Sequence, residues 1–186
     1  NYSYGYRGQG TPATLAALGR KLGFRVEIVP PQTDGEELIS STAIRQALTE
    51  GNVEKARRFL GSWPVLEGTV AGGDGRGRTL GFPTANVAVP GYILLPRTGV
   101  YAAKCCVGEE SFLAVVNIGR KPTFKQEPSP VVEAHLLDFS GDLYGRKLEV
   151  HLFKYLRSEM RFKHADELKQ QIARDIDRAR LVARTL

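Results

Sequence analysis

The chain has 186 residues, of which 42% are hydrophobic and 25% charged, a composition typical of a soluble globular protein. No apolar run approaches the roughly 18 residues of a membrane span, and no charged-then-apolar leader opens the chain, so we expect neither a membrane anchor nor a targeting segment. The net charge of +6 and the isoelectric point near 9.4 suit nucleic acid and an anionic nucleotide substrate equally, and the positive residues are spread along the chain. The first residues look like the middle of a longer sequence, so we expect the N-terminus to be a cut end.

The first 62 residues predict helices and one strand. Thr11-Pro12, followed by leucines at helical spacing, predicts a first helix. The alternation over residues 24–29 predicts a strand. Two short helices are expected next, one opened by Ser40-Ser41-Thr42 and one running from Asn52 to Leu60.

From Pro64 to about Arg157 the period of the hydrophobic pattern changes to two. Turns rich in Gly, Pro or Asp separate six short candidate strands, and this spacing favours a small closed barrel, which has no free edges. A final helix is predicted to lie against the barrel through Leu168, Ile172, Ile176, Ala179 and Ala183, with Arg, Lys and Asp on its opposite side. The candidate strands are residues 65–71, 85–89, 100–107, 112–118, 131–138 and 148–156.

The two cysteines, Cys105 and Cys106, are adjacent on a predicted strand. Neighbouring side chains on a strand point to opposite faces, so a disulfide between them would be strained. The sequence therefore predicts two reduced thiols, one inside and one outside, in a cytoplasm-like compartment.

A glycine-rich stretch from Gly72 to Gly81 contains Arg76 and Arg78. Glycines allow backbone N–H groups to approach phosphate oxygens closely, and arginines pair with the phosphate charge. No Gly-Lys-Ser/Thr follows, so the stretch is not a Walker loop. A flexible hairpin loop is the alternative interpretation.

Oxygen-bearing side chains follow this loop. Thr84 and Asn86 are two apart on a predicted strand, so both point the same way, and their oxygens are ligands that Mg²⁺ accepts. Glu133 shares a strand face with His135 and apolar residues, where a carboxylate suits the task of orienting a substrate hydroxyl. A turn closed by Thr and Asn, and a solvated surface Glu, are the corresponding alternatives.

Several motifs follow one another in order after the Gly/Arg loop: Leu80-Gly81-Phe82-Pro83-Thr84-Ala85-Asn86, Thr98-Gly99-Val100-Tyr101, Asn117-Ile118-Gly119, Pro122-Thr123-Phe124, Val132-Glu133-Ala134-His135, Asp142-Leu143-Tyr144-Gly145 and Tyr155-Leu156-Arg157. This ordered set resembles riboflavin kinase, specifically the C-terminal half of the bacterial bifunctional riboflavin kinase/FAD synthetases, over roughly residues 62–186. The resemblance implies a six-stranded antiparallel, Greek-key-like barrel with a C-terminal helix over residues 63–186. Residues 1–62 would be a partial α/β remnant of a Rossmann-like FMN adenylyltransferase domain.

The resemblance implies transfer of the γ-phosphate of Mg-ATP to the 5′-hydroxyl of riboflavin, giving FMN and ADP. By matching position, Thr84 and Asn86 would hold Mg²⁺, and Glu133 would take the proton from the ribityl hydroxyl. Only small-molecule substrates are implied, with no nucleic acid or membrane partner. The remaining assigned positions are Gly72, Arg78, Gly81 and Tyr144 beside ATP, and Leu136, Arg157 and Phe162 beside the flavin.

Residues 39–45, Ile-Ser-Ser-Thr-Ala-Ile-Arg, resemble a signature of the nucleotidylyltransferase half of the same enzymes. That half also uses an early His-x-Gly-His motif, and the histidines of this chain all lie later, at His135, His151 and His164. The resemblance therefore implies that this chain makes FMN but no FAD. Two positions depart from the family pattern near the flavin: Ser158 replaces a usual Pro, and His164 replaces a Ser-like helix cap.

Two other functions stay open from sequence alone. An OB-like barrel that binds nucleic acid would carry exposed aromatics for base stacking, whereas Tyr101, Phe112, Phe139 and Tyr155 are scattered along the chain. A flavin- or nucleotide-binding barrel without catalysis is the second alternative. FMN formation with and without magnesium distinguishes all three functions.

Overall fold

The computed structural model describes residues 3–72, 77, 80–121 and 129–186. The chain divides into two compact units, Asn1–Ser40 and Ser41–Leu186. In the described part of the chain, no helix combines the length and the apolar character that crossing a bilayer requires.

The first unit is built around helix α1 (Pro12–Leu22), as predicted. Thr11 caps the helix: its hydroxyl accepts a hydrogen bond from the Thr14 N–H, and the Thr14 hydroxyl accepts one from the Thr11 N–H. Gly23, with φ of 80°, ends the helix in the left-handed conformation that favours glycine. The other elements of this unit are the 3-10 helix η1 (Tyr6–Gly8) and the antiparallel strands β1 (Thr33–Asp34) and β2 (Glu37–Leu38).

The strand predicted over residues 24–29 is wrong, because these residues form neither strand nor helix. The side chains of Phe24, Ile28 and Val29 are 45%, 55% and 75% exposed. Alternating residues form a stable strand when a neighbouring strand takes their hydrogen bonds and one face packs on a core. Among the described residues of this unit, residues 24–29 have neither a neighbouring strand to hydrogen-bond with nor a core to pack against.

The second unit begins with helices α2 (Ser41–Glu50) and α3 (Val53–Leu60), both at their predicted places. The Asn52 side chain caps α3 by accepting a hydrogen bond from the Lys55 N–H at 3.0 Å. Val53 is fully buried among the core residues of the barrel that follows. The two helices therefore belong to the compact unit of the barrel, which starts at residue 41.

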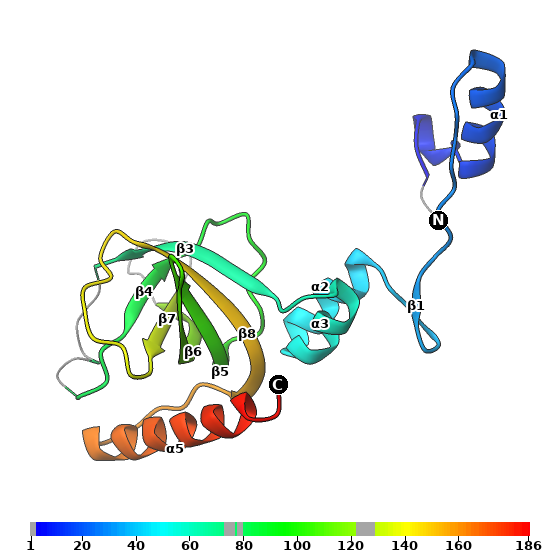
Figure 1. Cartoon of the computed structure of the whole chain (residues 1–186). Helices are drawn as coiled ribbons and strands as arrows, with labels where there is room; N and C mark the ends of the chain where they lie inside the picture. Colours follow the sequence, from blue (N-terminus) through cyan, green and yellow to red (C-terminus); the bar gives the residue numbers. More distant parts are fainter. Residues whose placement is uncertain (1–2, 73–76, 78–79, 122–128) are drawn as a thin grey trace. The chain divides into compact units, whose positions relative to one another are not determined.

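Six antiparallel strands close into a barrel in the order β3-β4-β7-β6-β5-β8 (Figure 1), which confirms the predicted barrel. The neighbours β4 and β7, and β5 and β8, are far apart in sequence, so the topology is Greek-key-like. The strands are β3 (Val65–Ala71), β4 (Ala85–Ala88), β5 (Gly99–Val107), β6 (Glu110–Lys121), β7 (Ser129–Leu136) and β8 (Lys147–Arg157).

Side chains alternate between the barrel core and its outer face, as a period of two requires. On β5, Tyr101, Ala103 and Cys105 are fully buried in the core, while Cys106 is partly exposed on the outer face. Both cysteines are free, as predicted. Burial, with a smaller contribution from the neighbouring Cys106, raises the pKa of the Cys105 thiol to about 12, so this thiol is inert at neutral pH.

Helix α5 (Ala165–Ala183) packs on the outer faces of β5, β6 and β8, which confirms its predicted position (Figure 1). Ile176 and Ala179 are buried against the barrel, and Val182 takes the place expected for Ala183, which is exposed. The prediction that Asp residues of this helix lie opposite its apolar stripe is wrong for Asp175, whose side chain is 1% exposed. Its burial is possible because an arginine of β8 pairs with it.

Candidate active site

One row of paired residues crosses the outer face of five strands. Asn86 of β4 lies opposite Glu133 of β7, and Glu133 lies opposite Asn117 of β6. Asn117 lies opposite Val100 of β5, which in turn lies opposite Arg157 of β8. Residues directly opposite on neighbouring strands have Cβ atoms about 4.5–5.5 Å apart. The fold therefore places a carboxylate between two amides, although the three residues are distant in sequence.

A pocket of about 400 Å³ lies over this row, between the barrel, the chain after β8 and helix α5. Polar and apolar side chains both line it, so the pocket suits a ligand that combines polar groups with a large apolar body. Its polar lining includes Thr84, Asn86, Asn117, Glu133, His135, Arg157, Glu159 and Asp175, and its apolar lining includes Leu80, Phe82, Val100, Val115, Met160, Phe162, Leu168 and Ile172.

His135 fixes the segment that carries Thr84. Its Nδ1 lies 2.8 Å from the Pro83 carbonyl oxygen, which is an acceptor, so Nδ1 carries the proton and donates it. The His135 ring also packs edge-on against Phe82, with centroids 5.6 Å apart. Gly77 lies so close that an added Cβ would collide with the Phe82 carbonyl. This position of the glycine-rich stretch thus needs glycine for close approach to the segment before β4.

Arg157 and Asp175 form an ion pair between β8 and α5. Arg157 Nε donates to both carboxylate oxygens at 3.1 and 3.0 Å, and Nη2 donates to Oδ2 at 2.7 Å. Gln171 Nε2 also donates to Asp175 Oδ1 at 3.0 Å, and Arg157 Nη1 donates to the Ser158 carbonyl at 2.9 Å. Nε, Nη1 and Nη2 of Arg157 therefore all donate to groups of the protein itself. The ion pair with Asp175 holds helix α5 beside the pocket.

The structure brings together five of the residues that the sequence singled out. The pocket contains Thr84, Asn86, Glu133, Arg157 and Phe162.

Other singled-out positions do not line the pocket. Leu136 is 5% exposed on the inward face of β7, in the barrel core, opposite to the face that carries Glu133. Tyr144 is 65% exposed and, like Gly72, lies away from the described lining. Gly81 is not in the lining but connects two residues that are. Arg78 lies outside the described residues.

Asn117 and Asp175 are among the pocket residues that carried no predicted role. Asn117 belongs to a motif that the sequence analysis quoted, but only the register of β6 against β7 shows that it adjoins Glu133. Asp175 lies three residues after Ile172 and four before Ala179, so helical spacing already places it within the apolar stripe of α5. A charged residue inside an apolar stripe is the signal that would have found it.

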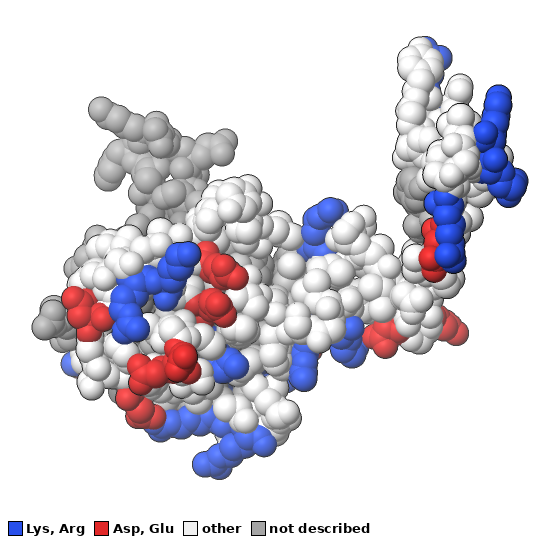
Figure 2. Space-filling view, turned by 45° about the horizontal axis from the view of Figure 1, so that its top comes forward, with Lys and Arg blue, Asp and Glu red and all other residues white. Residues whose placement is uncertain are grey.

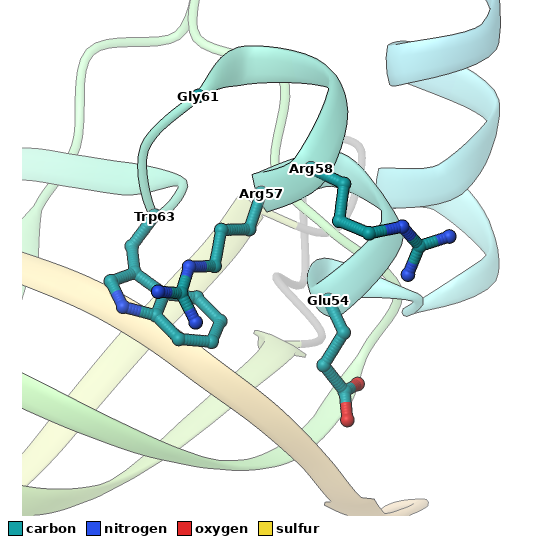
Figure 3. Close-up of a pocket in the computed structure, with 5 residues that line it drawn as sticks. All are labelled: Glu54, Arg57, Arg58, Gly61 and Trp63. Carbon is teal, nitrogen blue, oxygen red and sulfur yellow. The ribbon is translucent and has the colours of Figure 1, made fainter. Parts of the chain in front are cut away.

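A second hollow lies at the end of α3, lined by Glu54, Arg57, Arg58, Gly61 and Trp63 (Figure 3). Figure 3 shows the Arg57 guanidinium over the indole of Trp63, with its carbon 4.1 Å from the ring centroid. Glu54 forms an ion pair with Lys154 of β8 at 3.1 Å. These contacts pack α3 against β8, so we interpret this hollow as a structural junction.

The charge and the aromatic residues do not favour a nucleic-acid surface. On the face shown in Figure 2, Lys and Arg side chains lie next to Asp and Glu side chains on the barrel. Tyr101 is fully buried and packs edge-on against Tyr155, with centroids 5.2 Å apart, and Phe112 packs in the same way against Phe139 at 5.1 Å. These aromatic rings contact one another and are not arrayed for base stacking.

Comparisons with known proteins agree with this geometry. The family model described as riboflavin kinase matches residues 60–183. Proteins named bifunctional riboflavin kinase/FMN adenylyltransferase are 42% identical over 177 residues in Listeria monocytogenes and 41% identical over 179 residues in Escherichia coli K12. Each match covers 94% of this chain and 55% or 56% of the relative, so the chain spans about half the length of these relatives.

Among solved structures, a Streptococcus pneumoniae protein named a macrolide-efflux protein superposes with a TM-score of 0.86. It is 32% identical, and the match covers 97% of this chain and 58% of that one. This likeness supports the arrangement of the barrel and its helix.

Proposed function

This chain belongs to the riboflavin kinase family, and on that premise we propose that it transfers the γ-phosphate of Mg-ATP to the 5′-hydroxyl of riboflavin. A bond forms between the hydroxyl oxygen and the γ-phosphorus, the bond to the β-phosphate oxygen breaks, and FMN and ADP result. The observation that carries the proposal is the position of Glu133 between Asn86 and Asn117, in a pocket lined by both polar and apolar side chains.

Glu133 is the proposed general base. It lies on the pocket face of β7, so it can accept the proton of a hydroxyl bound beside it in the pocket. Apolar residues of the lining, which include Phe162 and Met160, would contact the flat ring system of the flavin. Phosphoryl transfer depends mainly on positioning and on charge stabilisation, and a rigid barrel face supplies the first.

Thr84 and Asn86 fit a magnesium ion that accompanies ATP. Both line the pocket, and a hydroxyl and an amide carbonyl are oxygen ligands of the kind that Mg²⁺ accepts while keeping waters and phosphates in its shell. The ion would neutralise charge on the phosphates. The hydrogen bond from His135 to the Pro83 carbonyl keeps the residue before Thr84 in place, which supports a preformed site.

The remaining assignments are also proposals. Gly81 lies between Leu80 and Phe82, both in the pocket lining, which supports a place for it near the triphosphate. Gly72, Arg78 and Tyr144 are proposed for ATP from the resemblance alone, and Leu136 is not proposed for the flavin because it faces the core. Arg157 is proposed to border the flavin while its main partner stays Asp175.

The test is FMN formation from riboflavin and ATP, with magnesium present and with magnesium removed by chelation. We expect magnesium-dependent FMN, resolved from riboflavin by chromatography. Flavin binding without FMN would favour a regulatory barrel. If the chain neither binds flavin nor forms FMN, the kinase proposal is refuted.

We further propose that residues 1–62 correspond to the end of an FMN adenylyltransferase half, and that the parent enzyme also makes FAD. The relatives that match 94% of this chain carry both activities in their names, and the family match begins at residue 60. A cytoplasmic location is proposed because both cysteines are free thiols.

A further inference from the structure

A cluster of metal-ligand types lies on the outer face of β5 and β8. Cys106 of β5 is directly opposite Glu149 of β8, and His151 follows two residues later on the same face of β8. The Cys106 sulfur, a Glu149 oxygen and a His151 ring nitrogen all lie within 4.8 Å of one another. His151 Nε2 and Glu149 Oε2 are 3.2 Å apart.

We propose that Cys106, Glu149 and His151 form a binding site for a zinc-class divalent ion. Thiolate, imidazole and carboxylate are the three side-chain ligands that zinc uses, with bonds of about 2.0–2.3 Å. A tetrahedral arrangement with such bonds places ligand atoms roughly 3.3–3.8 Å apart. The 3.2 Å separation of His151 and Glu149 is just below this range and the other separations are within 4.8 Å, so side-chain rotations on a fixed backbone complete the geometry.

The surroundings of the cluster suit a cation that enters from solvent. The side chains of His151 and Glu149 are 22% and 53% exposed, so an ion has access. Glu67 of β3 lies directly opposite Glu149, outside the three-residue cluster, and adds a second negative charge beside it. Lys104 lies opposite His151, so one positive charge borders the site. A thiolate and one carboxylate balance the charge of a divalent ion, and Glu67 offsets the charge of Lys104.

This site differs from the proposed magnesium site in place and in chemistry. It lies toward the end of the β5–β8 ladder that carries Cys106 and Glu149, whereas the pocket lies over the end that carries Val100 and Arg157. Mg²⁺ prefers oxygen ligands, while sulfur and nitrogen ligands select zinc-class ions. An excess of Mg²⁺ should therefore leave the Cys106 site available.

The experiment titrates the full chain with Co²⁺, a spectroscopic substitute for zinc, in excess Mg²⁺. We expect one equivalent to bind with a thiolate-to-cobalt charge-transfer band, and Zn²⁺ to abolish the band. Cys106→Ser should remove the band, and His151→Gln should weaken Co²⁺ binding at least tenfold. Cys105→Ala and His164→Gln are the matched controls, and both should keep the band and the affinity.

Two results would overturn the proposal: no stoichiometric charge-transfer band in the wild-type chain, or a band that persists in Cys106→Ser. A thermal readout is independent of the spectroscopy, because an ion that binds only the folded state raises Tm. Zn²⁺ should raise Tm of the wild-type chain and leave Cys106→Ser unchanged. Cys106→Ser should also form FMN at the wild-type rate, so failure of this site and failure of the proposed kinase activity are separate outcomes.

Discussion

Replacing Asp175 with alanine removes the acceptor of four hydrogen bonds where β8 meets α5, three of them from Arg157 and one from Gln171. The two charged side chains are 1% and 15% exposed, so the substitution leaves a largely buried guanidinium without its counter-ion. Removing one partner of a buried ion pair costs roughly 3–5 kcal/mol, and the residual exposure of Arg157 places the expected loss near the lower end, about 3 kcal/mol.

Urea unfolding of the wild-type and Asp175→Ala chains measures this loss, and thermal unfolding gives a second value. For a chain of this size 1 kcal/mol corresponds to about 2–4 °C, so Tm should fall by roughly 6–12 °C. Arg180→Ala is the matched control on the same helix. Arg180 and Asp138 are 3.9 Å apart with side chains 51% and 87% exposed, and such a surface pair contributes at most about 1 kcal/mol.

A double variant distinguishes two causes of the stability loss in Asp175→Ala: an unpaired buried charge on Arg157, and lost side-chain packing. Replacing Arg157 with methionine together with Asp175→Leu removes both charges and fills the space with apolar atoms, which is often neutral for stability. We expect the double variant to recover most of the stability that Asp175→Ala loses. If Asp175→Ala costs no more than Arg180→Ala, or if the double variant is as unstable as the single one, the reasoning is refuted.

Glu133→Gln should lower kcat for FMN formation by roughly 10²–10⁴-fold with flavin affinity unchanged, because the amide cannot accept the proton; a loss under about tenfold contradicts this role. Thr84→Val and Asn86→Leu should raise the magnesium concentration needed for half-maximal rate, since each removes one oxygen ligand, and an unchanged magnesium titration would contradict the assignment. Incubated with FMN, ATP and magnesium, the 186-residue chain should give no FAD above a no-enzyme control on chromatography, because it lacks the early histidine motif; FAD above the control would show an unrecognised site. Deleting residues 1–40 should leave Tm of the barrel and FMN formation unchanged, whereas deleting residues 1–62 should lower Tm by removing core side chains of α3; equal stability of the two deletions would argue against that packing.

Local patterns predicted most of the elements of the barrel unit. The alternation of side chains, the Asn52 cap and the apolar stripe of α5 each depend on interactions within a few residues, and all appear in the structure. The segment 24–29 has the same alternation as a barrel strand but does not form a strand in the structure. Alternation shows which face a strand would bury, and the rest of the fold decides whether a strand forms.

The sequence singled out residues of the pocket one by one, but not their arrangement. Thr84, Asn86 and Glu133 were identified from the sequence, yet their proximity depends on the register of β4 against β7, which no local pattern specifies. The partner of Arg157 was missed because the Asp residues of α5 were assigned to the side opposite its apolar stripe. A buried carboxylate needs a cation nearby, and only the packing of α5 on β8 shows which cation that is.

The pairing of the first barrel strand with the last has a consequence for synthesis and folding. Strand β8 pairs with both β3 and β5. Each of these two strands therefore has one unpaired edge until residues 147–157 have been synthesised. Contacts between such distant segments slow folding, and open strand edges pair readily with other chains. Chains that stop before Lys147 should therefore aggregate, and the nascent protein benefits from a holding chaperone until β8 leaves the ribosome.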